Sequence, residues 1–182
     1  TTTTTTTATA TTTTNSNSLI NHILPFYFST PDVFQEELDF VRKTAKEFFN
    51  GENNLLTIPN VSNEAGVTVL VEQYGIKAFL MGTRSTDPDG QWLNGVFWPS
   101  SKGWCPFMRI NPCLHWSYNE VWIFLRFFNI EYCSLYDDGY TSIGTKSTSK
   151  PNPMLKSKHK FHPAYMLADG TKERAGRMKK RK

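Results

Sequence analysis

The stretch Gly82–Gly90, GTRSTDPDG, places charged and polar side chains directly after an apolar run, Lys77–Met81. A plain turn requires glycine, proline and an aspartate, but it does not require Arg84. Ligands of open α/β sheets bind at the carboxyl ends of the strands, where a glycine such as Gly82 lets the backbone come close. Beside it, Thr83 supplies a hydroxyl, Arg84 a planar cation and Asp87 a carboxylate. We interpret this stretch as the floor of a nucleotide site; the alternative is a structural turn capped by Asp87.

A second group of candidate residues lies toward the C-terminus. Residues 156–182 contain ten Lys and Arg against two acids, whereas residues 1–155 carry ten basic and fourteen acidic groups. Within this basic segment, Arg174 and Arg177 are three residues apart, so a helical segment would place both on one face. Such a tail is typically a solvated end of the chain, and less often an anion or nucleic-acid contact.

Hydrophobic patterning in the first half predicts alternating strands and helices. A helix is expected from Thr30 at the N-cap to a stop at Gly51, because apolar residues recur there at helical spacing. The segment Ser62–Tyr74 is ambiguous: its Val-rich centre favours a strand, while its length and flanks suit a helix. This order predicts an α/β fold with an open, mostly parallel sheet and helices on both faces. The expected strands are Ile23–Phe28, Leu55–Ile58 and Lys77–Met81.

The second half begins with a long loop, Thr83–Pro106, whose length favours a functional role over simple connection. A short strand is expected at Phe107–Ile110. The run Ser117–Glu120 is a capping box, and it opens a helix that ends near Phe128. Loops and short strands are expected after it. The residues that this helix should bury are Val121, Trp122, Leu125 and Phe128, and the spacing of Trp116, Trp122 and Phe124 also favours a core role.

Composition limits the remaining possibilities. Residues 1–18 form a threonine-rich tract that we expect to be disordered, leaving residues 19–182 as one α/β domain with a basic tail. No run reaches the ~18 apolar residues of a membrane span, and no secretory or transit signal is evident, so we expect a cytosolic protein. Three cysteines without a CxxC pair suggest reduced core thiols, and no metal ligands are assigned.

Five motifs that follow one another along the chain resemble those of the eukaryotic FAD synthetases, or FMN adenylyltransferases, of the phosphoadenylyl-sulfate reductase-like group. Any one of them alone would be weak, but five in order are specific, and the resemblance runs from about Ile23 to the C-terminus. The motifs are GTRSTDPDG, residues 107–112 with Trp116 shortly after, residues 135–144 (LYDDGYTSIG), Pro151-Asn152-Pro153 and residues 173–177 (ERAGR).

The resemblance implies an adenine-nucleotide alpha-hydrolase-like fold and a reaction in which FMN attacks the α-phosphorus of MgATP. The products are FAD and pyrophosphate, and the implied substrates and ion are ATP, FMN and Mg²⁺. It implies that Asp87 and Arg84 are the catalytic residues. Asp87 would lie at the junction of flavin and ATP and Arg84 near phosphate, with Arg109 a weaker candidate for the same work near phosphate. Arg174 and Arg177 would return over the flavin and its phosphate. The other implied binding residues are Gly82, Thr83, Thr141 and Ser142.

Two departures from the family pattern bear on activity. Ser101 stands where the family usually has an aspartate. The chain also lacks any Gly-Gly pair, so we expect the glycine-rich phosphate loop and the first, central strand of the family to be missing from it. A separate polypeptide or an upstream segment is then expected to supply that loop. The alternative is a non-catalytic flavin or nucleotide binder.

Other function classes are less well supported. A reductase of this group needs a C-terminal nucleophilic cysteine, and the last cysteine here is Cys133, which disfavours that role. A nucleic-acid binder that uses residues 179–182 is the remaining class, and we do not favour it. It would bind DNA or RNA with a strong salt dependence and without flavin.

Overall fold

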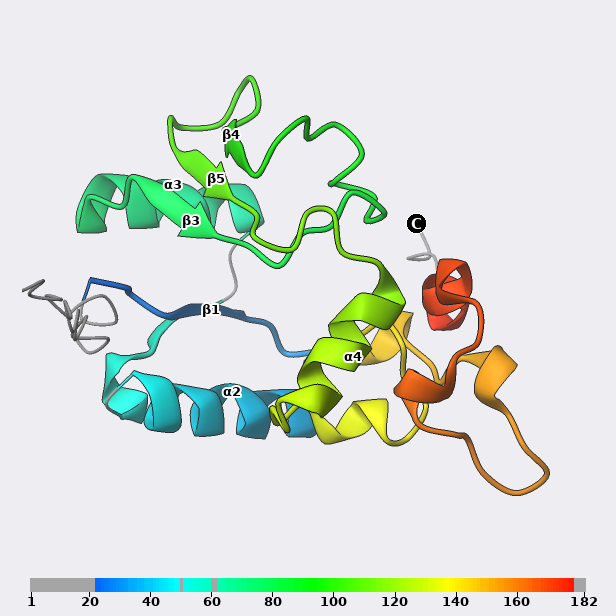
Figure 1. The fold of residues 1–182 in the computed structure, drawn as a ribbon. Helices are drawn as coiled ribbons and strands as arrows, with labels where there is room; N and C mark the ends of the chain where they lie inside the picture. Colours follow the sequence, from blue (N-terminus) through cyan, green and yellow to red (C-terminus); the bar gives the residue numbers. More distant parts are fainter. Residues whose placement is uncertain (1–21, 50, 60–61, 179–182) are drawn as a thin grey trace, which may run out of the picture.

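The structure is a computed structural model that describes residues 22–49, 51–59 and 62–178. The expected disordered tract and the four basic residues at the C-terminus lie outside the described residues. In this described part, two small sheets and three α-helices form one half, and a C-terminal region of short 3₁₀ turns forms the other (Figure 1). Within the described part of the chain, no helix is long and apolar enough to cross a membrane.

The first sheet pairs β1 (Phe26–Ser29) with β2 (Leu56–Pro59) in parallel, and helix α2 (Gln35–Phe48) connects them with the short turn η1 (Glu52–Asn54). The predicted start of this helix is wrong, because α2 begins after Phe34 and has no side-chain cap. The carboxylate of Asp32 instead accepts hydrogen bonds from the backbone N–H and the hydroxyl of Ser147. This contact holds the chain ahead of α2 against a distant loop.

The ambiguous segment Ser62–Tyr74 is a helix, α3 (Asn63–Tyr74). The Ser62 hydroxyl accepts a hydrogen bond from the N–H of Ala65, and Gly75 ends the helix in the left-handed conformation with φ of 66°. These caps outweigh the strand propensity of the valine-rich centre. Gly66 packs so closely on β1 that a Cβ there would lie 2.4 Å from the ring of Phe28.

The second sheet has the order β3-β5-β4, formed by Ala78–Leu80, Met108–Ile110 and Phe97–Pro99. Strands β3 and β5 are parallel, as expected, while β4 pairs antiparallel with β5 from within the segment predicted to be a continuous loop. The expected α/β class with open, mostly parallel strand pairing is confirmed, but the expectation of one sheet is wrong for the described residues. Here the strands divide into two sheets, and no ladder joins β1 to β3.

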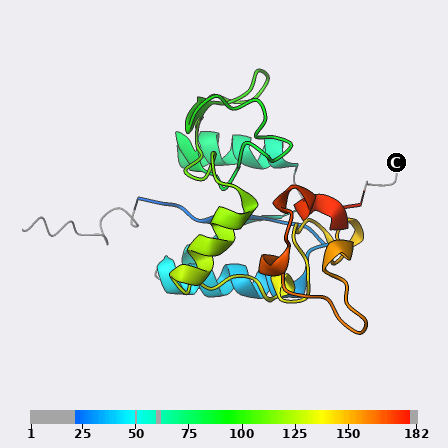
Figure 2. The ribbon, with the colours of Figure 1, turned by 45° about the vertical axis from the view of Figure 1, so that its right-hand side comes forward.

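Helix α4 (Tyr118–Phe127) opens with the predicted capping box, in which Ser117 and Glu120 cap each other. Trp122 is buried as expected, but Phe128 is 59% exposed and Phe124 39% exposed, so the core role predicted for both is wrong. The buried face of α4 packs on the C-terminal region instead, through Tyr118 and Trp122. Figure 2 shows this region folded against α4.

The C-terminal region consists of 3₁₀ turns rather than the expected short strands, and the described residues there contribute only isolated bridges. Its last element, η6 (Gly170–Gly176), lies against the start of α4, where Gly170 meets Tyr118. The remaining turns are η2 (Ser134–Tyr136), η3 (Lys146–Thr148), η4 (Pro153–Leu155) and η5 (Ala164–Met166).

Candidate functional site

The loop Gly82–Gly90 leaves β3 and folds into a turn built around Asp87. One carboxylate oxygen of Asp87 accepts the backbone N–H of Arg84 at 2.8 Å, while the N–H of Asp87 donates to the Arg84 carbonyl at 3.0 Å. Gly90 closes the turn so tightly that a Cβ there would lie 1.8 Å from the Arg84 carbonyl oxygen. Asp87 therefore caps the turn, as the structural alternative requires, and its carboxylate also reaches the guanidinium of Arg84 at 3.2 Å.

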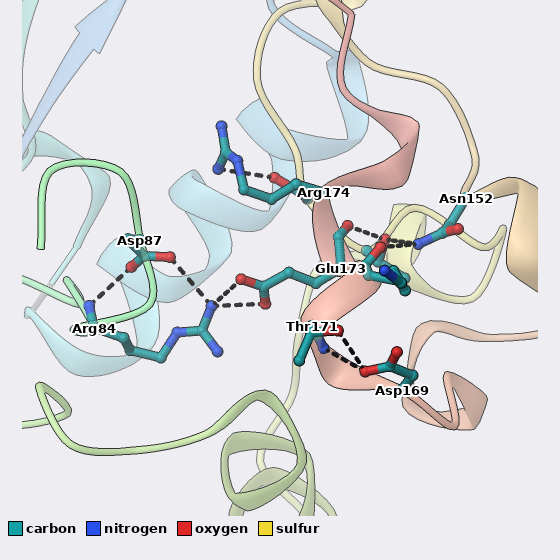
Figure 3. Close-up of polar contacts among 10 residues, drawn as sticks. Arg84, Asp87, Asn152, Asp169, Thr171, Glu173 and Arg174 are labelled. Carbon is teal, nitrogen blue, oxygen red and sulfur yellow. Dashed lines mark hydrogen bonds and ion pairs between the residues drawn. The ribbon is translucent and has the colours of Figure 1, made fainter. Parts of the chain in front are cut away.

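Arg84 forms an ion pair that no sequence motif predicted. Its Nη2 lies 2.6 Å from both carboxylate oxygens of Glu173, and the two side chains are only 12% and 10% exposed (Figure 3). Burial lowers the pKa of Arg84, but Glu173 and Asp87 outweigh it and raise the pKa above its ordinary value. The signal in the sequence was that Glu173 opens the ERAGR motif and is one of two acids in the basic segment. Two carboxylates thus surround the single positive charge of Arg84.

Thr141 helps to hold η6 in place through Asn152, which is fully buried. The side-chain amide of Asn152 donates to the Thr141 hydroxyl at 2.8 Å and to the Lys172 carbonyl at 2.9 Å. The Thr141 hydroxyl in turn donates to the Glu173 carbonyl. Thr141 is thus buried and engaged within the protein, rather than a free donor, and this network fixes the backbone that carries Glu173.

Arg174 and Arg177 lie beside the Thr141–Gly144 loop. Nη1 of Arg174 is 3.5 Å from the Ser142 hydroxyl, while the guanidinium of Arg177 lies over Gly144, where a Cβ would be 2.3 Å from its Nη2. Burial, and then the positive charge of Arg174, lowers the pKa of Arg177. Within the described residues neither arginine has a carboxylate in salt-bridge range, and the buried Nε of Arg177 has no hydrogen-bond partner.

The loop Gly82–Gly90 borders two cavities of different character. Thr83 and Asp89 line a cavity of about 520 Å³, whereas Arg84 and Thr86 line another of about 470 Å³. Among the residues that the structure describes, nothing beyond its chain neighbours lies within 4 Å of a Cβ built on Gly82, so the backbone there is open to a ligand. The first cavity is largely aromatic, with Trp92, Trp98, Trp104 and Phe107 in its walls. The second is polar, with Ser117, Asn119, Thr171, Glu173 and Arg174.

Arg109 lies in the wall of the aromatic cavity. Its Nη1 donates to the Pro99 carbonyl at 2.6 Å, its Nη2 lies 3.3 Å from the Ser101 hydroxyl, and its guanidinium packs over Phe107. Burial lowers the pKa of Arg109, and Asp89 offsets part of that effect. The serine that departs from the family pattern is therefore a direct neighbour of a partly buried cation.

The acidic, histidine and cysteine side chains do not cluster into a metal site in the described residues. Over the ranges that the structure describes, no group of three or more His, Cys, Asp or Glu side chains is placed to hold a metal ion. Mg²⁺ in nucleotide sites is commonly held by one or two carboxylates together with substrate phosphates. The carboxylates of the loop are Asp87 and Asp89, and both oxygens of Asp87 are engaged by Arg84.

The fold, and the match of residues 57–151 to the phosphoadenosine phosphosulfate reductase domain, place this chain in that domain family. A probable FAD synthase of Schizosaccharomyces pombe is 45% identical over 157 residues, covering 85% of this chain and 57% of the relative. A probable FAD synthase of Caenorhabditis elegans is 33% identical over 158 residues, covering 84% of this chain and 30% of the relative. The predicted resemblance is confirmed, and the chain spans at most about half the length of these relatives.

Solved structures agree with the fold. The crystal structure of yeast FAD synthetase in complex with FAD superimposes with a TM-score of 0.73 at 26% identity, covering 84% of this chain and 66% of that one. Candida glabrata FMN adenylyltransferase, solved with FMN and an ATP analogue, gives a TM-score of 0.75 at 23% identity. The match covers 86% of this chain and 67% of that one.

Proposed function

We propose that this chain forms the flavin- and phosphate-binding part of an FMN adenylyltransferase, which makes FAD from FMN and MgATP. The observation that carries this proposal is the position of the Gly82–Gly90 loop between an aromatic cavity and a polar one. The relatives from Schizosaccharomyces pombe and Caenorhabditis elegans are named probable FAD synthases, which supports this activity. The solved complexes of similar fold contain FAD, or FMN with an ATP analogue.

The aromatic cavity suits the flavin ring. Trp92, Trp98 and Trp104 offer flat apolar surfaces, and offset or edge contacts between aromatic rings contribute roughly 0.5–1.5 kcal/mol beyond area burial. Arg109 adds a cation to the same wall. The ring would enter from the side of Trp92, which is 75% exposed.

The phosphates would lie toward Arg174 and Arg177. A guanidinium binds phosphate with two parallel hydrogen bonds, and these two cations have no carboxylate partner among the described residues. In adenylyl transfer the protein does little covalent work, so positioning and charge neutralisation carry the catalysis. Arg84 and Asp87 then lie at the junction of the two cavities. Asp87 holds the shape of the loop, and Arg84 connects the loop to Glu173.

Flavin fluorescence tests this proposal. FAD fluoresces less than FMN because its adenine stacks on the flavin. When the unmatched part of the Schizosaccharomyces pombe relative is added as a separate polypeptide, a slow fall in fluorescence that requires MgATP is therefore expected. An immediate, saturable change that ATP does not extend would instead favour a non-catalytic flavin binder. No change at all would contradict both. Ser101, in place of the family's aspartate, is the observation that favours the non-catalytic alternative.

A further inference from the structure

The walls of the aromatic cavity carry very little charge. Of the described residues that line this cavity of about 520 Å³, Arg109 is the only cation and Asp89 the only carboxylate. Neutral polar groups come from Asn63, Thr83 and Ser101, and the rest of the lining is apolar. The charge that a ligand ring carries is therefore answered chiefly by Arg109 and Asp89.

The guanidinium of Arg109 is fixed in place, yet it keeps donors for a ligand. Its Nη1 and Nη2 contact the Pro99 carbonyl and the Ser101 hydroxyl, and its central carbon lies 5.1 Å from the centre of the Phe107 ring. These contacts engage two of the five N–H groups of an arginine. No nitrogen of Arg109 is among the buried, unpartnered atoms of the described chain, so the remaining N–H groups are accessible.

The positive charge of Arg109 has no direct carboxylate partner. Across residues 22–49, 51–59 and 62–178, no carboxylate lies within salt-bridge range of it, whereas Arg84 has two. Asp89 acts on Arg109 only from a longer distance, and it is exposed, so solvent screens it. Ser101, the side chain in contact with Nη2, is neutral. An anionic ligand atom could thus approach Arg109 more closely than any carboxylate of the described chain does.

The charge of a flavin ring depends on its redox state. The oxidised isoalloxazine ring is neutral. When it gains two electrons and one proton, it carries one negative charge, which is shared by N1 and the C2 carbonyl oxygen. Protein charge near N1 is one of the means by which a site tunes a flavin. A cation at that position favours the reduced ring.

The lining of the cavity suits one orientation of this ring. Phe26, Phe28 and Val67 offer apolar surface to the edge of the flavin that carries its methyl groups. Arg109 and Ser101 offer hydrogen bonds to the pyrimidine edge, which contains N1 and the C2 carbonyl. Because a buried polar edge without hydrogen bonds is costly, the pyrimidine edge is expected at Arg109.

We propose that Arg109 makes the aromatic cavity selective for reduced FMN, whose ring is anionic, over oxidised FMN. This inference rests on the proposed flavin-binding function and deepens it, because it names the redox state that the site prefers. The neutral Ser101 is a condition for this preference, since a carboxylate there would pair with Arg109. A charge-assisted hydrogen bond is roughly twice as strong as a neutral one, so reduced FMN should bind about tenfold more tightly.

The midpoint potential of bound FMN tests this proposal. A fluorescence titration of oxidised FMN with the full chain first measures flavin binding. FMN with an excess of the chain is then titrated anaerobically with dithionite, which supplies the electrons. Tenfold tighter binding of the reduced form should raise the two-electron midpoint potential by about 30 mV relative to free FMN. The phosphate is present in both redox states, so its contacts cancel from this shift.

Two pairs of variants separate the charge of Arg109 from its packing. Ser101→Asp places a carboxylate beside the guanidinium and should abolish the positive shift, whereas Ser101→Asn is similar in size but neutral and should retain it. Arg109→Gln should also abolish the shift. Its control is Lys102→Gln, which removes a positive charge from an exposed residue outside the cavity lining and should retain the shift. If Arg109→Gln does not fold, the two variants of Ser101 still decide the question.

Different outcomes would overturn this inference and the function on which it rests. An unchanged or lowered potential in the wild type, or equal shifts in Ser101→Asp and Ser101→Asn, would overturn the redox preference and leave the flavin site in place. Failure of both oxidised and reduced FMN to bind would remove the proposed flavin site, and the preference with it.

Discussion

Glu173 and Arg84 are 89 residues apart in the sequence, yet Nη2 of the arginine lies 2.6 Å from both oxygens of the carboxylate. This pair joins the loop after β3 to the C-terminal element η6. Because Arg174 follows Glu173 directly, the same contact sets the position of the candidate phosphate-binding arginines relative to the loop. The ion pair is thus a structural link between the two halves of the proposed site (Figure 3).

Glu173→Gln should destabilise the protein by roughly 2–4 kcal/mol, because it leaves a mostly buried cation with Asp87 as its one remaining carboxylate partner in the described residues. Urea unfolding followed by circular dichroism measures this change. The matched control is Glu131→Gln, which breaks an ion pair with Lys43 whose side chains are both 59% exposed. That change should leave the unfolding midpoint almost unchanged, because solvent and salt screen an exposed pair. Equal losses in the two variants would show that Arg84 does not depend on Glu173.

Asn152→Ala should also destabilise the fold, by roughly 2–4 kcal/mol, because it removes three hydrogen bonds at a fully buried position and leaves their partners unsatisfied. The exposed Asn53, changed to alanine, is the control and should shift stability by less than about 0.5 kcal/mol. The unfolding midpoint in urea measures the stability change of each variant. A stable Asn152→Ala protein would mean that η6 is held by other contacts.

The sequence predicted the regular elements better than the site. The strands at β1, β2, β3 and β5 and the capping box of α4 follow from local periodicity and caps, which act within a few residues. The partner of Arg84 could not be found in this way, because the pairing depends on how the 3₁₀ turns return the chain to the loop. The start of α2 was misplaced for the same reason, since Asp32 binds Ser147, which is 115 residues away.

Stability should depend on pH through Glu37. Burial raises the pKa of this carboxyl above its ordinary value of 4.5, although a hydrogen bond from Tyr27 opposes the shift. The native state therefore binds the proton more tightly than the unfolded state, so stability falls as pH rises from about 4.5 through the raised pKa.

Glu37→Gln should be more stable than the wild type at neutral pH and similar to it below about pH 4. Glu47→Gln, at an exposed position of α2, is the control. A wild type that gains stability relative to Glu37→Gln as pH rises would reverse the assigned sign.

Gly144→Ala should weaken FMN binding while changing stability little. A Cβ at this position would lie 2.3 Å from Nη2 of Arg177, and the flexible arginine can move aside at small cost in free energy. Its guanidinium would then leave the place where we expect phosphate. Gly95→Ala is the control, because its Cβ would lie at an ordinary distance of 3.7 Å from the Phe97 carbonyl oxygen. It should change neither FMN binding nor stability. FMN titration and thermal unfolding together test this prediction, and unchanged FMN affinity in Gly144→Ala would remove Arg177 from the site.

Arg177→Ala should lower FMN affinity by about 10- to 100-fold, because a charge-assisted hydrogen bond contributes roughly 1.5–3 kcal/mol and each 1.4 kcal/mol is tenfold in affinity. Riboflavin, which lacks the phosphate, should bind equally well to the wild type and the variant. Arg42→Ala removes the same charge from an exposed position on α2 and corrects for the change in net charge. Fluorescence titrations at two salt concentrations complete the test, since the loss of a phosphate contact should also reduce the salt dependence of FMN binding. If the affinities for FMN and riboflavin fell by the same factor, Arg177 would act on the flavin or on the fold, and the phosphate site would have to be placed elsewhere.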